Sequence, residues 1–361
     1  MNIADVAELS FAGLKRSLQE RAFLQKRRGL PRPSAVRVTL TERCNYRCQY
    51  CFHWRRERYK PELSLEEWKA IISDLHEYIG PFPVQFLGGE PMIWPGFVQL
   101  VQHCSSLGMR WGVISNGSAL SRKSVPAIVA ARPSNIDISL DASDPAIHDL
   151  ARGVDGSHRH IVDGVMRLVA ARAAAKQRFP IRIKTTFHRL NAGHLVELVE
   201  WVRRHPRMSI DFSPVRLWPS VERDKLYIQT EEDHAKLDET LRALVTLKTA
   251  GAPIETSVDK LLGIADHFRG KHVFHAYREC RVGLRTLDIG ADGSARHCER
   301  FSIGNLTSHS IAELWESELR KKQIEETLVC EMAGGNECGT ACTAYRSLRQ
   351  EASRAWLFLK S

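Results

Sequence analysis

Short β-rich runs alternate with amphipathic, helix-like segments over the first 220 residues of the chain. The runs read AVRVTL (35–40), VQFL (84–87), RWGVIS (110–115), NIDISL (135–140), IRIKTTF (181–187) and SIDFSPV (209–215). Between the first two runs, Ser64 and Glu67 have the spacing of a capping box and predict the start of a helix. Strands that alternate with helices predict an α/β fold with a parallel sheet. Six such units fit an open barrel or a doubly wound sheet.

Segments of a different character flank this alternation. A helix is predicted over about residues 5–28, before the sequence LPRPS. After residue 220, a helix with Thr230 as its N-cap is predicted, and RVGLRTLDIGADGSARH predicts a hairpin that turns at Asp292 and Gly293. Further helices are expected around residues 310–326, opened by a Ser310/Glu313 capping box, and over about residues 343–359.

These patterns divide the chain into five expected regions. They are an N-terminal helical extension (1–34), a barrel-like unit (35–220), a helical linker (221–274), a small cysteine-rich α+β domain (275–345) and a C-terminal helix (346–361). The barrel-like unit is large enough to have a hydrophobic core of its own.

Composition excludes two classes of protein. The 361 residues are 43% hydrophobic and 26% charged, and no run of about 18 apolar residues predicts a membrane span. The N-terminus lacks the basic and apolar regions of a secretory signal, so a cytoplasmic protein is expected. In a reducing compartment, nine cysteines favour metal or redox chemistry over a disulfide framework.

The net charge of +10 could indicate an anionic partner. The basic residues are spread along the chain, however, and a nucleic acid partner is not favoured. A zinc-bearing nucleic-acid-binding protein stays as a remote alternative, because HWRRERYK (53–60) places basic and aromatic residues beside a cysteine cluster.

Polar or glycine-containing segments follow every predicted strand. The first strand precedes a cluster of cysteines, and the others precede GGEP (88–91), SNGS (115–118), DAS (141–143), HRLN (188–191) and RLW (216–218). In a β/α barrel, the loops after the strands form the active-site face. We therefore expect these segments to meet at one mouth.

The cysteine cluster has the spacing C-x3-C-x2-C, formed by Cys44, Cys48 and Cys51. Zinc prefers four ligands in a closed tetrahedral site, and His53 could be the fourth. Alternatively, a four-iron cluster with three protein ligands would leave one iron open, whereas iron–sulfur clusters normally use four thiolates. The spacing alone leaves both metal centres possible.

This cysteine spacing after a first strand, with the aromatic Tyr50 before the last cysteine, resembles the radical S-adenosylmethionine (radical SAM) superfamily. The resemblance implies a partial (β/α)6 TIM-like barrel and a [4Fe-4S] cluster on the three cysteines. It also implies cleavage of S-adenosylmethionine (SAM) to a 5′-deoxyadenosyl radical that abstracts a hydrogen atom from a substrate. An electron donor such as flavodoxin or ferredoxin is then expected.

The resemblance also assigns a SAM site, residue by residue. GGEP is similar to the family motif that receives the amino group of SAM, with Tyr50 near the adenine and Arg152 near the carboxylate. The remaining candidates follow the third and fourth strands. The full set is Tyr50, Gly88, Gly89, Glu90, Pro91, Ser115, Asn116, Ser139, Asp141 and Arg152. Turn formation or helix capping is the alternative role for such residues.

The C-terminal region resembles the SPASM and twitch domains, in which a cysteine-rich unit holds an auxiliary [4Fe-4S] cluster. The matching features are Cys280, Gly283, the Asp292-Gly293 turn, Cys298 and GNL (304–306). Two of Cys330, Cys338 and Cys342 are expected to complete the ligand set, with Cys338 and Cys342 preferred. A structural zinc ribbon is the alternative.

The resemblance favours a radical SAM enzyme of peptide or protein modification, or of natural-product maturation. A dehydrogenase or epimerase of a sugar or aminocyclitol is the alternative, and an electron-transfer protein without radical chemistry is a third possibility. Only about 34 residues precede the first strand, which weakens the peptide interpretation because such enzymes often carry a leader-binding domain. The candidates for the side of the site that faces the substrate are His188, Arg216 and Trp218.

Overall fold

The computed structural model describes residues 18–26, 29–80, 82–216, 223–271 and 280–330. Its central feature is a nine-stranded sheet in the order β6-β5-β4-β3-β2-β1-β7-β8-β9. The six predicted strands are confirmed as a continuous parallel set. Their bounds are β1 Ala35–Thr41, β2 Pro83–Gly88, β3 Arg110–Ser115, β4 Asn135–Ser139, β5 Ile181–Phe187 and β6 Met208–Pro214.

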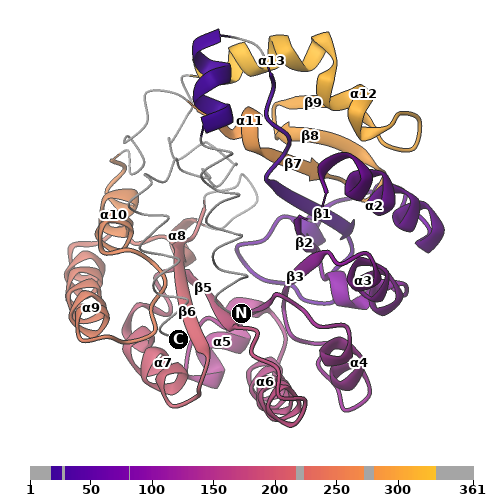
Figure 1. The fold of residues 1–361 in the computed structure, drawn as a ribbon. Coiled ribbons are helices and arrows are strands. Elements are labelled where there is room, and N and C mark those ends of the chain that lie inside the picture. Colours follow the sequence, from indigo (N-terminus) through magenta and orange to yellow (C-terminus); the bar gives the residue numbers. More distant parts are fainter. Residues whose placement is uncertain (1–17, 27–28, 81, 217–222, 272–279, 331–361) are drawn as a thin grey trace.

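Helices connect these strands and lie along the outer side of the curved sheet (Figure 1). The helices between the strands are α2 Leu65–Ile79, α3 Phe97–Ser106, α4 Ser124–Ala130, α5 Pro145–Arg152, α6 Ser157–Ala174 and α7 Leu195–Arg203, with short 3-10 turns η1 His53–Arg55, η2 Pro91–Ile93 and η3 Ala192–His194. Within the described ranges, no helix is both long enough and apolar enough to span a membrane.

The predicted helix starts are confirmed by their caps. Ser64 and Glu67 form a reciprocal capping box at α2, and Thr230 caps α9 (Glu231–Thr249). Ser310 and Glu313 form the predicted box at α12 (Ile311–Glu316). The single helix predicted over 310–326 is wrong, however, because Ser317 is extended (φ −60°, ψ 149°), ends α12 and caps a second helix, α13 (Glu318–Leu328).

The strands of the parallel set place apolar side chains on one face and polar side chains on the other. In β5, for example, Ile181 and Ile183 are fully buried, while Arg182 and Lys184 alternate with them. The apolar face packs against the outer helices in one core that includes Trp68 of α2 and Trp111 of β3. The inner face of this part of the sheet therefore carries polar and charged groups where a closed barrel would have branched apolar side chains.

Three C-terminal strands extend the same sheet. They are β7 Thr286–Ile289, β8 Ser294–Cys298 and β9 Phe301–Asn305, and β7 pairs with β1 in parallel while β8 and β9 are antiparallel. The predicted hairpin is confirmed, with its turn between β7 and β8. Arg37 of β1 donates two hydrogen bonds to Asp288 of β7, at 2.5 and 2.6 Å.

The N-terminal segment and the helices before and after the hairpin pack together beside this extension of the sheet. Residues 18–26 are helical, and Phe23 from this segment packs against Leu284, Ile324 and Leu328. Leu284 belongs to α11, which spans Val282–Arg285 and leads into β7. Figure 1 shows α11, α12 and α13 around β7–β9. The predicted last helix, over 343–359, lies outside the described residues.

The region predicted as a linker packs against the sixth strand. It contains α8 Arg223–Leu226, α9 and α10 Val258–Phe268. The segment between α9 and α10 runs beside β6, where Ile210 donates a backbone hydrogen bond to Pro253 and accepts one from Glu255. These contacts place Glu255 and Thr256 beside the inner face of the sheet.

Candidate active site at the carboxyl edge of the parallel strands

The loop after β1 carries Cys44, Cys48 and Cys51 and is fixed by backbone hydrogen bonds. Arg47 N–H donates to the carbonyl oxygen of Arg152 at 3.1 Å, and Gln49 N–H donates to that of Ala151 at 2.9 Å. Both acceptors belong to the last turn of α5, where helical carbonyl groups have no partner within their own helix. The cysteine loop therefore closes the end of α5, which brings residues from β1 and α5 together.

N–H groups point at the sulfur atoms of this loop. Cys44 Sγ accepts from the Tyr46 backbone at 3.4 Å and from Asn116 Nδ2 at 3.8 Å, and Cys48 Sγ accepts from Arg152 at 3.8 Å. Burial raises the pKa of the Cys48 thiol to about 12, although the Arg152 charge opposes this shift. Burial also raises the pKa of Cys44 and of Cys51. Groups that donate to sulfur suit thiolates that are ligated to iron.

The two glycines of GGEP are required by the chain itself. A Cβ on Gly88 would lie 2.2 Å from the carbonyl oxygen of Thr41, and one on Gly89 would lie 2.1 Å from that of Arg43. Gly88 also has a φ of +154°. This close approach allows Gly89 N–H and Glu90 N–H to bond the Thr41 and Arg43 carbonyls, at 2.8 and 2.9 Å. The glycines thus dock the second loop onto the exit of β1.

Glu90 links the loops after β2 and β3. Its fully buried carboxylate accepts hydrogen bonds from Ser115 Oγ at 2.8 Å, from Asn116 N–H at 2.6 Å and from Met92 N–H at 3.0 Å. Burial raises the pKa of Glu90 to about 7, against the lowering effect of these bonds. Pro91 follows as the first residue of η2. Because three of about four acceptor positions of this carboxylate are filled, little capacity remains for an ammonium group.

Asp141, Arg152 and Tyr50 form a buried polar cluster beside the cysteine loop. Arg152 Nη2 and Nε lie 2.9 and 2.8 Å from the two carboxylate oxygens of Asp141, and Tyr50 Oη donates to Asp141 at 2.6 Å. Burial alone would raise the pKa of Asp141, but the Arg152 charge leads the groups that bring it below its ordinary value. Arg152 keeps its charge, since Asp141 outweighs the effect of burial and raises its pKa. The cluster is therefore an ion pair fixed next to Cys48.

Three residues that the sequence did not reveal hold Asp141 in place. His148 Nδ1 accepts from Asp141 N–H at 3.1 Å, Thr186 N–H donates to the Asp141 carboxylate at 3.0 Å, and Asn191 Nδ2 donates to its carbonyl oxygen at 2.7 Å. The motif HRLN contains Asn191, but its spacing from Asp141 carries no local signal of this contact. These bonds join the loops after β4 and β5.

His188 lies at the same edge, fully buried, with its ring centroid 5.9 Å from that of Tyr50. Neither of its ring nitrogens makes a hydrogen bond to a described residue. Burial lowers the pKa of His188 to about 4, so the imidazole is neutral near pH 7. An unsatisfied buried imidazole indicates unused hydrogen-bonding capacity at this edge of the sheet.

The remaining candidates from the sequence are Ser139, Arg216 and Trp218. Ser139 lies on β4 two residues before Asp141, and its register partner is Lys184 on β5. Arg216 follows β6 by two residues and is half-buried. Trp218 lies outside the described residues, so its predicted place on the substrate side stays a prediction.

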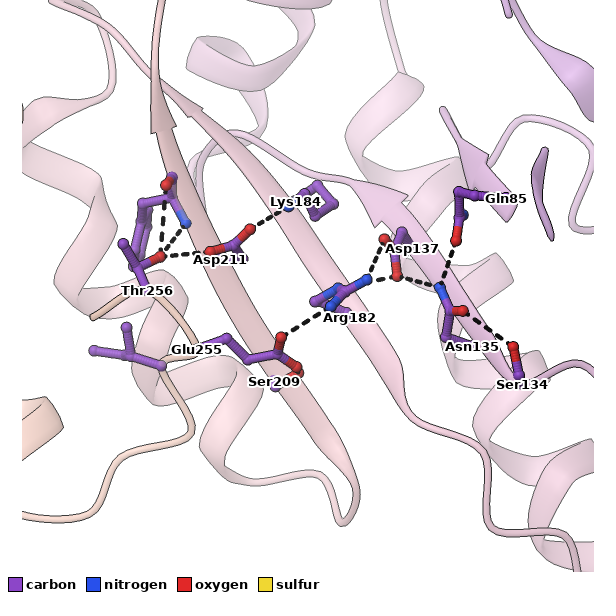
Figure 2. A network of polar contacts seen from close by, with 12 residues as sticks. Gln85, Ser134, Asn135, Asp137, Arg182, Lys184, Ser209, Asp211, Glu255 and Thr256 are labelled. Carbon is purple, nitrogen blue, oxygen red and sulfur yellow. Dashed lines mark hydrogen bonds and ion pairs between the residues drawn. The ribbon is translucent and has the colours of Figure 1, made fainter. Parts of the chain in front are cut away.

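A polar network covers the inner face of β4, β5 and β6 below this edge (Figure 2). Arg182 donates to Asp137 at 2.6 and 3.0 Å and to Glu255 at 2.9 Å. Lys184 pairs with Asp211, which also accepts from Thr256 Oγ1 at 2.7 Å. The side chains of Lys184 and Asp211 are 28% and 25% exposed, so part of this ion pair stays accessible to solvent.

A second set of cysteines gathers beside α11 and β8. Cys280 and Cys298 are buried in one cluster with Val282, and Cys330 packs against it. The pKa of Cys298 is raised by burial and by the neighbouring Cys280 and Cys330 thiols. Arg300 donates to Cys330 Sγ at 3.6 Å. The preferred candidates Cys338 and Cys342 lie outside the described residues.

Both cysteine sets suit iron–sulfur centres in their donor chemistry. Soft thiolate ligands favour iron–sulfur clusters and zinc, and hydrogen bonds to sulfur occur at both sets. Among residues with described positions, no group of three or more His, Cys, Asp or Glu side chains has the arrangement of a single metal-ion site. His53 lies in η1 with its ring 4.4 Å from that of Phe52.

Two family models match the parts of the chain that contain the two cysteine sets. The family model of the radical SAM superfamily matches residues 38–201, and that of an iron–sulfur cluster-binding domain, SPASM, matches residues 280–343. PqqA peptide cyclase of Rhodopseudomonas palustris is 33% identical over 169 residues, which are 46% of this chain and 43% of the relative. PqqA peptide cyclase of Rhizobium meliloti is 29% identical over 302 residues, or 80% of this chain and 76% of the relative. The chain thus spans under half of the first relative.

Among solved structures, Streptococcus suis SuiB bound to S-adenosylmethionine has a similar fold, with a TM-score of 0.66 at 14% identity. The match covers 85% of this chain and 71% of that chain. The expected α/β fold with a small C-terminal strand-rich unit is confirmed. The family models therefore confirm the two expected domains, a radical SAM domain over residues 38–201 and an iron–sulfur cluster-binding SPASM domain over residues 280–343.

Proposed function

We propose that this protein is a peptide-modifying radical SAM enzyme. The observation that carries the proposal is the meeting of three loops at one edge of the sheet. These are the cysteine loop after β1, the Glu90 corner and the Asp141–Arg152 pair. The corner and the ion pair each direct a nitrogen donor to a cysteine sulfur.

In this proposal Cys44, Cys48 and Cys51 hold a [4Fe-4S] cluster, and SAM occupies the neighbouring mouth. When it is bound and reduced, the cluster supplies one electron to the sulfonium of SAM, which yields methionine and a 5′-deoxyadenosyl radical that takes a hydrogen atom from the substrate. The electron comes from a donor of the flavodoxin or ferredoxin class.

The side chains at the mouth would bind and orient SAM. Arg152 bears a buried positive charge for the SAM carboxylate, and its fixed pairing with Asp141 limits its rotation. The Tyr50 ring lies beside Arg152 and His188 and offers an aromatic face to the adenine. His188 contributes two ring nitrogens whose hydrogen-bonding capacity no described residue fills. Glu90 acts by fixing Asn116 and Ser115 rather than by binding an ammonium group directly.

A peptide is the proposed substrate because of the curated relatives. Two of them bear the name PqqA peptide cyclase, and one alignment covers 80% of this chain. SuiB, which shares the fold, has also been solved bound to its precursor peptide SuiA. The polar inner face, with Lys184 and Asp211 partly exposed, can hydrogen-bond to a polar chain that enters the interior.

The decisive experiment measures 5′-deoxyadenosine after anaerobic reconstitution with iron and sulfide, with dithionite as reductant. We expect about eight irons per chain, for two four-iron clusters, and formation of 5′-deoxyadenosine. Absence of 5′-deoxyadenosine from a sample that holds its full iron would refute the radical function.

The substrate class is tested with a deuterated PqqA peptide from Rhizobium meliloti as the probe. Transfer of deuterium into 5′-deoxyadenosine, together with a change in peptide mass, supports a peptide substrate. If PqqA is inert, a library of deuterated peptides is compared with deuterated sugars and aminocyclitols. Deuterium transfer only from the small molecules would refute the peptide proposal while leaving the radical function intact.

A further inference from the structure

Arg320 is a buried cation without an anionic partner. It belongs to α13, it is fully buried, and none of the carboxylates with described positions pairs with it. One nitrogen, Nη2, donates to the carbonyl oxygen of Gly283, whereas Nε and Nη1 have no hydrogen-bond partner in the described part of the chain. Its guanidinium carbon lies 3.3 Å from the ring centroid of Trp315, a contact that replaces only part of the lost hydration.

Burial without a carboxylate partner costs free energy of folding and makes the guanidinium of Arg320 easier to deprotonate. Burial lowers the pKa of Arg320 to about 9, and the neighbouring Tyr78 opposes this shift. Arg285 of α11, which is half-buried, has by contrast a carboxylate partner, since its Nε donates to Glu20 at 2.6 Å. Buried charges are normally paired or bound to metal centres. Among the residues that the structure describes, Arg320 therefore has no carboxylate to balance its charge.

The second cysteine set lies close to this cation. Gly283, whose carbonyl oxygen accepts from Arg320, follows Cys280 by three residues, a chain length of at most about 10 Å. On the other side, His297 adjoins Cys298, and its Nε2 forms a hydrogen bond with Thr327 Oγ1 at 3.0 Å, which ties β8 to α13, the helix that carries Arg320. No carboxylate separates the guanidinium from the cysteines in these contacts.

We propose that Arg320 is the counter-charge of the iron–sulfur cluster in the C-terminal domain and raises its reduction potential. A [4Fe-4S] cluster with four thiolates is anionic and gains a further negative charge on reduction. A buried cation within about 10 Å favours the reduced state by roughly tenfold in the redox equilibrium. The inference rests on the proposed function only in that it requires this second cluster.

The test uses the full chain with Cys44, Cys48 and Cys51 changed to Ala, so that only the C-terminal centre titrates. Redox titrations followed by electron paramagnetic resonance compare Arg320 with R320M, R320K and K321M. Lys321 is the adjacent residue, half exposed and paired with Glu318, and it is the matched control. We expect R320M to lower the midpoint by about 59 mV, the equivalent of tenfold for one electron, and the other two variants to shift it much less.

Unfolding in urea of the metal-free chains separates this role from a structural one. Without the cluster, R320M removes an uncompensated charge, so its urea midpoint is expected to lie above that of the parent. An unchanged reduction potential in R320M, or a lower urea midpoint for metal-free R320M, would overturn the proposal. If the parent itself binds no second cluster, the cluster assignment fails instead, and the two failures are distinct.

Discussion

Replacing Arg152 by Met is expected to destabilise the metal-free protein strongly. Asp141 is fully buried, and without Arg152 its carboxylate keeps only the Tyr50 hydroxyl and the Thr186 N–H. Removing one partner of a buried ion pair costs about 3–5 kcal/mol, because the other charge stays buried. With a urea dependence of roughly 3 kcal/mol per molar, the midpoint falls by about 1–1.7 M.

The pH dependence of the unfolding free energy is a second, independent test of this prediction. In the parent, the pKa of Asp141 lies below 3.8, so the ion pair contributes stability above pH 3.8 that is lost as the pH falls through the folded pKa. In R152M the largest remaining influence is burial, which raises the pKa of Asp141. The variant then gains stability on acidification, and its deficit relative to the parent is largest near pH 7 and narrows toward pH 4.

Urea unfolding of the metal-free chains under reducing conditions, at pH 7 and pH 5, measures both effects. The matched control is Arg203→Met on α7, because Arg203 forms a half-exposed pair with Glu200 at 3.4 Å. An exposed pair contributes about 0.5 kcal/mol. A loss under about 1 kcal/mol in R152M at pH 7, or a deficit that grows with acid, would refute the account of the ion pair.

Four further predictions concern the same edge of the sheet. Gly89→Ala should lower the unfolding free energy by about 2 kcal/mol or more, because its Cβ would lie 2.1 Å from the Arg43 carbonyl oxygen. The control Gly108→Ala, whose Cβ would have no atom within 4 Å, should lower it by about 1 kcal/mol because of the left-handed backbone. Glu90→Gln should flatten the pH profile of stability. In the parent, the contribution of protonated Glu90 to the unfolding free energy is fully present below pH 4.5 and is lost as the pH rises through about 7. An unchanged pH profile in the variant would contradict this assignment. His188→Leu should raise the unfolding free energy of the metal-free chain by about 1–3 kcal/mol, since it removes two unsatisfied buried nitrogens, and a lower unfolding free energy would show a hidden partner. The variant without the first three cysteines should form no 5′-deoxyadenosine yet keep about four irons in the second centre, and complete loss of iron would contradict two separate sites.

The strands and helix caps were predictable because their signals are local. The run IRIKTTF alternates buried and polar positions within seven residues, and the structure confirms it as β5. Ser64 and Glu67 are three residues apart, and their reciprocal hydrogen bonds follow from that spacing alone. The single helix expected over 310–326 failed for a local reason too, since Ser317 can cap a helix as readily as it can continue one.

The long-range contacts were not predictable in this way. The ion pair of Arg37 and Asp288 joins strands 251 residues apart, and no periodicity within either strand indicates the pairing of β1 with β7. The resemblance places GGEP, which contains Glu90, at the amino group of SAM, and this stays a prediction, but the partners of Glu90 within the chain could not be predicted. In the structure, the Glu90 carboxylate accepts hydrogen bonds from Ser115 and Asn116, which lie 25 and 26 residues further along the chain.

The parallel pairing of β1 with β7 places the two cysteine sets at opposite edges of the sheet. Cys44, Cys48 and Cys51 follow the carboxyl end of β1, whereas Cys280 precedes the amino end of β7, whose residues pair in register with Ala35–Val38. Cys298 ends β8, which runs antiparallel to β7 and therefore returns to the same edge as Cys280.

This separation has a consequence for the proposed chemistry. The seven residues of β1 span roughly 20 Å, and the polar inner face of β4–β6 lies along that length. Lys184 and Asp211 lie on β5 and β6, which β4 to β1 separate from β7 in the sheet, so a substrate that contacts them would lie away from the C-terminal extension. Because the two cysteine sets lie at opposite ends of the paired strands, changes at one set should leave the other intact.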